Sequence, residues 1–442
     1  MILRHMRSNL AVLVSAALAV AAYGQIKNPG FETGSGAQAS SWTTFGNAFR
    51  EASGARTGSF GLKLFGGFNG GTSVSGAFQR IEIAPGSRVY ASCWAINRSS
   101  DAMSGDNFAV LKLVYFDKGG NEIEAKESRP IRGNTFKDRY HLISASLGPS
   151  PKAAVVCNIY LLFIQPASTP FASGSVTFDD IAVTIEATNL NKLVWNDEFS
   201  GKGLDLNKWE PMIGDGTAYG IPGWGNNELQ FYTGRPENVV VEEGFLRIRA
   251  RRENYGGKQF TSARLRTLNK YDFRYGRIEA RIQVPAGQGL WPAFWMLPSN
   301  SPYGTWASSG EIDIMEMVNA ADRVHGTVHF GDVWPGQQSN GGSRSIMSGF
   351  HTYVVDWRPD EIVWSVDGVE YHRVTSMEWW SRVGFWNQRA PFDTPFHLLL
   401  NVAVGGNWPG APNQFTQFPA EMLVDYVRVY QYVPKLDISR SR

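Results

Sequence analysis

The chain has 442 residues, enough for two or three domains that each bury a hydrophobic core. Its 42 Lys and Arg residues nearly balance 40 Asp and Glu residues, and the net charge of +2 gives no basis for nucleic acid or an anionic membrane as a partner. The 47 glycines, the 13% aromatic content and many short Val/Ile/Tyr/Trp runs between turn residues predict an all-β chain.

The first 24 residues predict an export signal. Met1 to Arg7 is basic, Leu10 to Ala22 is apolar, and the small residues Ala22 and Gly24 suit a cleavage site. The apolar run is short for a membrane-spanning helix, and the sequence has no other long apolar run. We therefore expect a secreted protein, extracellular or periplasmic, without a membrane partner. Retention of the segment as an N-terminal anchor is the alternative.

Residues 25–187 predict one β sandwich, with strand candidates at 88–95, 109–116 and 153–163. Its opening Asn28 to Glu32 and its closing Val176 to Val183 resemble jelly-roll carbohydrate-binding modules related to family 4. That resemblance implies a sugar-binding role, and the aromatic candidates for stacking on sugars are Trp42, Phe45, Phe68, Trp94 and Tyr115. The pair Cys93 and Cys157 is compatible with a disulfide or with two buried thiols.

A short polar linker is expected at 188–192, followed by a second domain at 193–434 and a tail at 435–442. All but two of the 15 tryptophans follow Leu193, which predicts a sugar-handling surface in this domain. Strands are expected at 245–251, 275–284, 362–366, 369–374, 397–404 and 425–433, and Asp367-Gly368 is typical of a type I′ hairpin. Strands without intervening helices predict a second sandwich, a jelly roll.

The most informative stretch is Gly310-Glu311-Ile312-Asp313-Ile314-Met315-Glu316-Met317. In a strand, alternation places Glu311 and Asp313 on one face and would bury Glu316 on the other, where an unpaired carboxylate is costly. A β-bulge at Ile314-Met315 would return Glu316 to the acidic face. Two carboxyl groups flanking a bond, with a third to tune them, suit glycoside hydrolysis; a solvated acidic strand edge is the alternative.

This octapeptide is similar to the catalytic strand of the laminarinase-like branch of glycoside hydrolase family 16, and the resemblance extends over roughly residues 191–433. It implies a retaining enzyme with Glu311 as nucleophile, Glu316 as general acid/base and Asp313 as the acid that orients and tunes Glu311. A retaining mechanism needs the two carboxyl groups about 5–5.5 Å apart.

The resemblance also implies a set of substrate-binding residues: Asn226, Arg264, Trp291, Trp295, Trp306 and His329. Trp291 and Trp295 are four residues apart in an extended segment and so share one face. Trp306 precedes the catalytic strand in Trp306-Ala307-Ser308-Ser309, where relatives commonly have Trp-Pro, so a less rigid loop is expected. His329 is expected to reach Glu316 and to assist its proton cycling.

Similar domains carry a structural Ca²⁺ on the convex face, and the matching positions here are Glu198, the carbonyl of Gly244, and Asp425. An ion at these oxygens would tie the first and last strands of the domain together. Ordinary surface charge is the alternative reading of the two acids. No cofactor is expected for catalysis.

Together these features predict a monomeric endo-β-1,3-glucanase that binds β-glucan polysaccharide and hydrolyses laminarin by double displacement. The alternatives are hydrolysis of mixed-linkage β-1,3-1,4-glucan or of a galactan such as agar or carrageenan, and transglycosylation by the same acids. A non-catalytic glucan-binding protein is a further alternative, against which the presence of all three acids argues.

Overall fold

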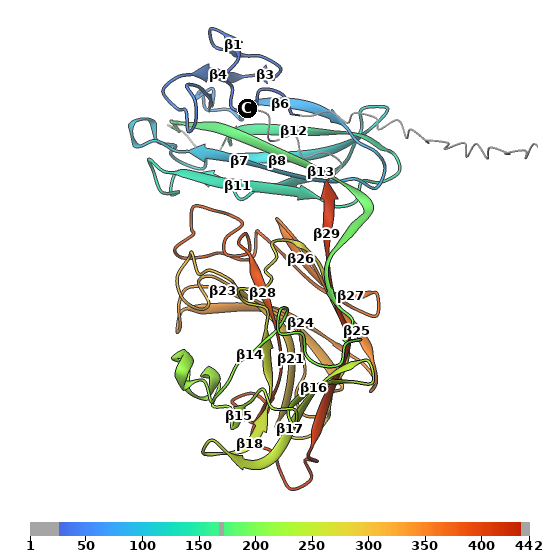
Figure 1. Cartoon of the computed structure of the whole chain (residues 1–442). Coiled ribbons are helices and arrows are strands. Elements are labelled where there is room, and N and C mark those ends of the chain that lie inside the picture. The colour runs from blue at the N-terminus through green and yellow to red at the C-terminus, as the bar shows by residue number, and fades with distance from the viewer. Residues whose placement is uncertain (1–25, 168–171, 435–442) are drawn as a thin grey trace, which may run out of the picture.

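The computed structural model describes residues 26–167 and 172–434, which together form two β sandwiches (Figure 1). The expected export signal at 1–24 and the tail at 435–442 lie outside these described residues. Within them no helix is long and apolar enough to cross a membrane. The helices that the structure describes are short 3-10 turns: η1 (Ser99–Asp101), η2 (Thr217–Tyr219) and η3 (Pro222–Gly225). The all-β prediction is therefore confirmed.

The first sandwich packs two sheets around one core. One sheet has the order β10-β8-β12-β6-β3 with β9 beside β8, and the other has the order β11-β7-β13-β5-β4. Cys93 and Cys157 are both buried in the core between the sheets and are not bridged. The strands are β1 (Gly34–Ser35), β2 (Gln38–Ala39), β3 (Thr43–Phe45), β4 (Asn47–Glu51), β5 (Gly61–Phe65), β6 (Ser73–Glu82), β7 (Arg88–Ile96), β8 (Phe108–Asp117), β9 (Glu122–Glu127), β10 (Ile131–Arg132), β11 (Tyr140–Leu147) and β12 (Ala154–Gln165).

Most of the aromatic residues suggested for sugar stacking in this sandwich have other roles. Trp42 and Tyr115 belong to its core. Trp94 stacks on Trp386 of the second sandwich with ring centres 5.7 Å apart. Phe68 is 38% exposed and remains open to a ligand.

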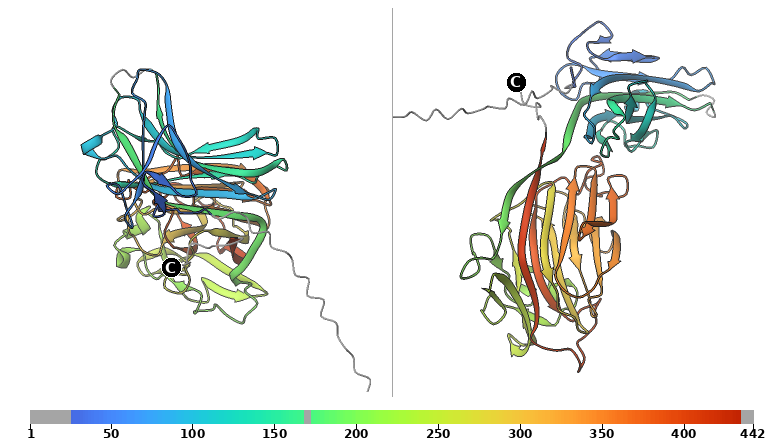
Figure 2. Two further views of the ribbon diagram at one scale, coloured as in Figure 1. Left: turned by 90° about the horizontal axis from the view of Figure 1, so that it is seen from above. Right: turned by 90° about the vertical axis from the view of Figure 1, so that its right-hand side faces the viewer.

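A single strand, β13 (Ser175–Asp197), joins the two sandwiches. It pairs with β5 and β7 in the first and with the last strand, β29 (Ala420–Pro434), in the second. The predicted linker at 188–192 lies where the pairing of β13 passes from β7, a pairing that ends at Glu186, to the run along β29 that begins at Asn191. The segment is part of one continuous strand and not a loop, because the backbone on either side of it is paired, which local sequence does not reveal. Figure 2 shows β13 and β29 crossing from one sandwich to the other side by side.

Polar contacts between the sandwiches reinforce this connection. The amide of Leu142 on β11 donates to the Trp386 carbonyl, and Gln388 bridges back to the backbone of Ser144. Arg88 forms an ion pair with Glu361, 2.6 Å apart, and both side chains are largely buried. The two domains therefore share an interface in addition to the strand.

The second sandwich packs a seven-stranded sheet, β14-β19-β28-β21-β22-β23-β24, against a sheet built from β16, β17, β29, β20, β25, β26 and β27. The strands are β14 (Glu210–Pro211), β15 (Gln230–Tyr232), β16 (Val239–Glu242), β17 (Phe245–Tyr255), β18 (Lys258–Ser262), β19 (Arg264–Arg266), β20 (Gly276–Gln283), β21 (Leu290–Pro298), β22 (Glu311–Glu316), β23 (Arg323–Gly331), β24 (Gln337–Ser345), β25 (His351–Arg358), β26 (Glu361–Val366), β27 (Val369–Thr375) and β28 (Phe396–Val404).

The strands predicted from alternation agree closely with these bounds. Strand β28, predicted from a continuous apolar run, is buried along its whole length between β19 and β21. The turn between β26 and β27 has positive φ at both Asp367 and Gly368, as a type I′ turn requires. Alternate residues of β28, from Phe396 to Val404, belong to the core, so the seven-stranded sheet has one face in the core and the other free to carry a site.

Candidate active site

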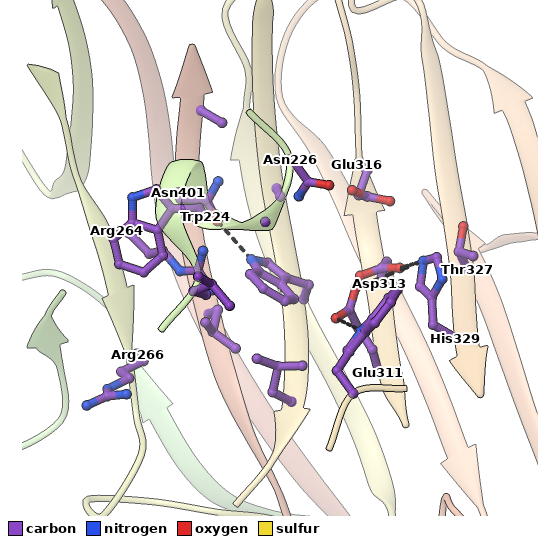
Figure 3. A pocket seen from close by; sticks show the side chains of 18 of the residues that line it. Trp224, Asn226, Arg264, Arg266, Glu311, Asp313, Glu316, Thr327, His329 and Asn401 are labelled. Carbon is purple, nitrogen blue, oxygen red and sulfur yellow. Dashed lines mark hydrogen bonds and ion pairs between the residues drawn. The ribbon is translucent and has the colours of Figure 1, made fainter. Parts of the chain in front are cut away.

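The open face of the seven-stranded sheet carries a cavity of about 670 Å³. It crosses β19, β28, β21, β22 and β23, and the loops before β15 and after β28 close one side. The structure brings together here every predicted catalytic and substrate-binding residue: Asn226, Arg264, Trp291, Trp295, Trp306, Glu311, Asp313, Glu316 and His329. Figure 3 shows the three acids on one strand, with His329 on the neighbouring strand.

The catalytic strand contains the predicted bulge. Asp313 pairs with Thr327 and Glu316 pairs with His325, so two residues of β22 face the single Gly326 of β23. Both residues of the bulge pack into the core with Ile312 and Met317, while the three acids line the cavity. The bulge is therefore what allows three carboxylates in six residues to share one face.

Glu311 lies at one end of this row. Its Oε2 accepts a hydrogen bond of 2.7 Å from Nε1 of Trp306. Burial, followed by the negative charge of Asp313, raises the pKa of Glu311 to about 8, whereas the His329 ring and the Trp306 N–H favour the ionised form. This environment lets Glu311 become an anion while it remains shielded from water, as a nucleophile requires.

Glu316 lies at the other end, where its Oε1 accepts a 3.0 Å hydrogen bond from Nε1 of Trp291. Burial and then the charges of Asp313 and Glu311 raise the pKa of Glu316 well above its ordinary value. Repulsion between the two glutamates is mutual, so ionisation of one opposes ionisation of the other. The His329 ring lies 3.9 Å from Oε1 of Glu311 and favours the anion there, an arrangement that suits Glu311 as the carboxylate and Glu316 as the proton donor.

The position of His329 corrects one prediction. Its Nε2 lies 3.2 Å from Oδ2 of the buried Asp313 and 3.9 Å from Oε1 of Glu311. The residue opposite Glu316 is His325, because His329 pairs with Glu311 in the register. Burial alone lowers the pKa of His329, but its contacts with Asp313 and the glutamates outweigh burial and raise the pKa to about 9. The expected reach of His329 to Glu316 was therefore wrong; as a cation His329 neutralises the charge of Asp313.

On the far side of the cavity, Arg264 lies between two indole rings. Its guanidinium carbon is 4.5 Å from the ring centre of Trp224 and 4.7 Å from that of Trp295. Trp295 in turn donates to Asn401 Oδ1 at 2.8 Å. The sequence analysis did not select Trp224 or Asn401, although Trp224 lies only two residues before the predicted Asn226.

Beside Glu316, Trp408 covers Trp291 and His325. Its ring packs edge-on against both, with centres 5.5 Å and 5.0 Å away, and 43% of it is exposed. It lies in the loop Gly405-Gly406-Asn407-Trp408-Pro409-Gly410, whose composition is typical of a turn and gives no reason to select the indole. Trp408 extends the aromatic lining beyond the predicted set.

The loop that carries Trp306 is anchored, although its sequence departs from Trp-Pro. Ser308 and Ser309 are both buried, and the Ser309 hydroxyl donates to the Gly304 carbonyl at 2.6 Å. Ser381 donates to the Ser308 carbonyl at 2.8 Å. The expected loss of rigidity is therefore offset by these hydroxyl contacts.

Removal of the Trp306 N–H should shift the pH dependence of the reaction. The N–H stabilises ionised Glu311, so Trp306→Phe raises the pKa of Glu311. Activity needs the ionised form, and the acid limb of kcat/KM moves to higher pH by up to about one unit. Trp408→Phe removes a cavity-lining indole that does not contact Glu311 and should leave the acid limb in place. An unmoved limb in Trp306→Phe would contradict this assignment.

The candidate calcium ligands are engaged by arginines. Glu198 accepts two hydrogen bonds from Arg428, at 2.8 Å and 2.7 Å, and Asp425 pairs with Arg281 at 2.7 Å. Each arginine neutralises a carboxylate that a divalent cation would need, so these residues do not fit a calcium ion as they are arranged. The ion stays a prediction from resemblance and has no part in the chemistry.

Comparison with known proteins relates the second sandwich to one family. The profile of glycosyl hydrolases family 16 matches residues 226–427. The glucan endo-1,3-beta-glucosidase A1 of Niallia circulans is 44% identical over 260 residues, which are 54% of this chain and 38% of that protein. The beta-glucanase of Rhodothermus marinus is 46% identical over 252 residues, 55% of this chain and 86% of that protein.

A solved structure shows the same relationship. The laminarinase from Rhodothermus marinus superposes with a TM-score of 0.50 at 44% identity, over 55% of this chain and 98% of that chain. The chain thus covers most of the matches from Rhodothermus marinus but little more than a third of the glucan endo-1,3-beta-glucosidase A1 of Niallia circulans. With the acids, the bulge and the jelly roll in place, these matches show that the chain belongs to glycoside hydrolase family 16.

Proposed function

We propose that this protein is a secreted endo-β-1,3-glucanase that hydrolyses internal bonds of laminarin-type glucans with retention of configuration. The observation that carries the proposal is the pair of glutamates on one strand face, Glu311 held by Trp306 and Glu316 held by Trp291, in a cavity lined by indoles. Indole faces stack on the apolar faces of pyranose rings. The names of the relatives, an endo-1,3-beta-glucosidase and a laminarinase, support the choice of β-1,3-glucan.

In the first step, Glu316 gives its proton to the glycosidic oxygen while the carboxylate of Glu311 attacks the anomeric carbon. The bond between that carbon and the leaving oxygen breaks, and an ester bond to Glu311 forms. Trp306 and His329 favour the anionic form of Glu311 in the free site. Asp313, itself neutralised by His329, holds the imidazolium beside the nucleophile.

In the second step, the carboxylate of Glu316 takes a proton from water, and the oxygen of that water attacks the anomeric carbon. The ester bond to Glu311 breaks, and both glutamates return to their starting protonation states. Two inversions give net retention.

The extent of the cavity supports internal cleavage of a polymer. It crosses five adjacent strands from Arg264 on β19 to His329 on β23. At about 4.8 Å per strand this spans roughly 19 Å, most of it on the β19 side of the acids and about one strand spacing on the β23 side, so the cavity is longer than a single sugar ring and continues on both sides of the acids.

The product profile of the purified protein on laminarin, beside lichenan, agarose and carrageenan, tests the proposal. We expect β-1,3-linked oligosaccharides from laminarin. NMR of the early products should show the β-anomer first, as retention requires. Cleavage of lichenan or a galactan, with no cleavage of laminarin, would contradict the proposed substrate but would leave the proposed roles of the three acids unchanged. Cleavage of none of the four would overturn the enzymatic proposal in favour of glucan binding.

A further inference from the structure

The catalytic bulge is contacted from behind by a tryptophan of the opposite sheet. Trp364 lies on β26, is fully buried, and donates from Nε1 to the backbone carbonyl of Asp313 at 2.7 Å. The accepting carbonyl belongs to the residue at which the register of β22 against β23 shifts. Because a bulge disrupts the ladder locally, this bond fixes the backbone where strand pairing is weakest.

Gly326 makes room for this contact. It is the single residue of β23 that faces the bulge, and its backbone passes directly over the Trp364 ring. A Cβ at this position would lie 2.3 Å from Cδ1 of Trp364 and 2.6 Å from the hydroxyl oxygen of Tyr371. Both distances are far below van der Waals contact. Any larger residue at this position would therefore displace the indole from beneath the bulge.

The ring of Trp364 is itself held in place. It packs against His372 of β27 with ring centres 5.2 Å apart and belongs to the core between the two sheets. A packed indole has little freedom to follow the carbonyl if the bulge moves. The hydrogen bond therefore fixes the backbone of the catalytic strand relative to the opposite sheet.

We propose that Trp364 is a positioning residue for the reaction: through the Asp313 carbonyl it sets the geometry of the bulge and thereby the placement of Glu316 relative to Glu311. The inference rests on the proposed glucanase activity only for the roles of the two glutamates. Trp364 does not line the cavity, so it acts through the strand and not on the sugar.

Trp364→Phe in the full chain tests the proposal, since phenylalanine keeps an aromatic ring and loses the N–H. On laminarin we expect kcat to fall about tenfold to a hundredfold with KM within about twofold, because displacements near 1 Å can cost on the order of 100-fold. Gly326→Ala, which displaces the indole, should give the same result, a lower kcat with little change in KM. The double variant should lose no more than the more impaired single variant, because both act through one contact.

Trp209→Phe is the matched control. Trp209 is also fully buried in the same core, and its Nε1 donates to Asp197 Oδ2 at 2.9 Å, away from the cavity. Loss of a hydrogen bond to a carboxylate destabilises at least as much as loss of one to a carbonyl. We therefore expect Trp209→Phe to lower the unfolding temperature comparably and to retain kcat. An equal loss of kcat in the control would assign the effect to general destabilisation and overturn the proposal.

A second readout does not require turnover. His329 contacts Asp313, and its titration by NMR reports the local geometry of the bulge. In Trp364→Phe we expect the His329 midpoint to fall toward the ordinary value, because the contact with Asp313 loosens, whereas Trp209→Phe should keep the wild-type midpoint. If the wild type cleaves no glucan, the proposed function fails while this titration still decides the role of Trp364. An unchanged His329 midpoint with unchanged kcat would overturn the role of Trp364.

Discussion

Glu311→Gln is expected to abolish hydrolysis of laminarin, a loss on the order of 10⁴-fold or more, as for the removal of other covalent nucleophiles. Glutamine has nearly the same shape, and its oxygen can still accept the bond from Trp306 that Glu311 accepts. Binding of the polymer should persist because the indole lining is untouched. Reducing-sugar release measures the first expectation, and affinity electrophoresis in laminarin measures the second. Residual activity near that of the wild type would assign the nucleophile elsewhere.

The same variant should be more stable than the wild type at neutral pH. An unfolded glutamate has a pKa of about 4.3, and burial raises the pKa of folded Glu311 to about 8. The unfolded state therefore releases this proton first as pH rises, and the free energy of unfolding falls between pH 4 and 8. Glutamine removes that loss, so the unfolding temperature of Glu311→Gln should exceed that of the wild type at pH 7 and match it near pH 4.

Glu253→Gln provides a control of opposite sign. The Thr261 hydroxyl, with Arg235 beside it, holds the pKa of Glu253 below its ordinary value. Its contribution to stability is present above the unfolded pKa, so its removal should lower the unfolding temperature at pH 7. A decrease in both variants would mean that the charge of Glu311 is not costly to the fold.

The acidic strand could be predicted in detail because its constraints are local. Alternation placed Glu311 and Asp313 together, and the cost of burying Glu316 required one extra residue, which the register shift confirms. Strand β28 follows from its apolar run, and the turn at Asp367-Gly368 follows from its dipeptide, and both signals are equally local. Period and turn chemistry thus determine the sheet that carries the site.

Contacts between distant segments could not be predicted in this way. Whether His329 faces Glu316 or Glu311 depends on the register of β23 against β22. A shift of the register by two residues keeps every side chain on the same face, so alternation alone does not distinguish the two registers. The stacking of Arg264 between Trp224 and Trp295 joins a loop and two strands. The Trp364 bond to the Asp313 carbonyl crosses from one sheet to the other.

The conformation of the connection between the domains could not be predicted for a related physical reason. A polar stretch between two apolar patterns reads as a linker, and 188–192 does connect the two sandwiches, but its backbone continues β13 as a strand. Trp94, a plausible sugar platform from sequence, packs instead against Trp386. Whether an aromatic residue is exposed depends on how the two domains pack together, and the sequence of one domain does not show this.

Glu316→Gln should separate the two steps of the reaction. Hydrolysis of laminarin should fall about 10²- to 10⁴-fold, because a sugar alkoxide leaves poorly without a proton. An aryl β-glucan oligosaccharide with a dinitrophenyl leaving group needs no proton in the first step, so its glycosylation should be much less impaired. The second step still lacks its base, and the Glu311 ester should accumulate. We therefore expect a burst of dinitrophenolate equal to the enzyme concentration, followed by slow turnover, with the ester visible by mass spectrometry.

The contrast between the two substrates identifies the role of Glu316. Trp291 can donate to the glutamine oxygen as it does to Glu316, so the pocket keeps its shape and the comparison isolates the proton. Glu311→Gln is the matched control, because loss of the nucleophile should remove the burst on the aryl substrate as well. Equal losses on both substrates in Glu316→Gln would exclude it as the proton donor. A burst in Glu316→Gln alone would establish that Glu311 forms the ester and Glu316 moves the proton, the division of labour that the position of the His329 ring beside Glu311 predicts.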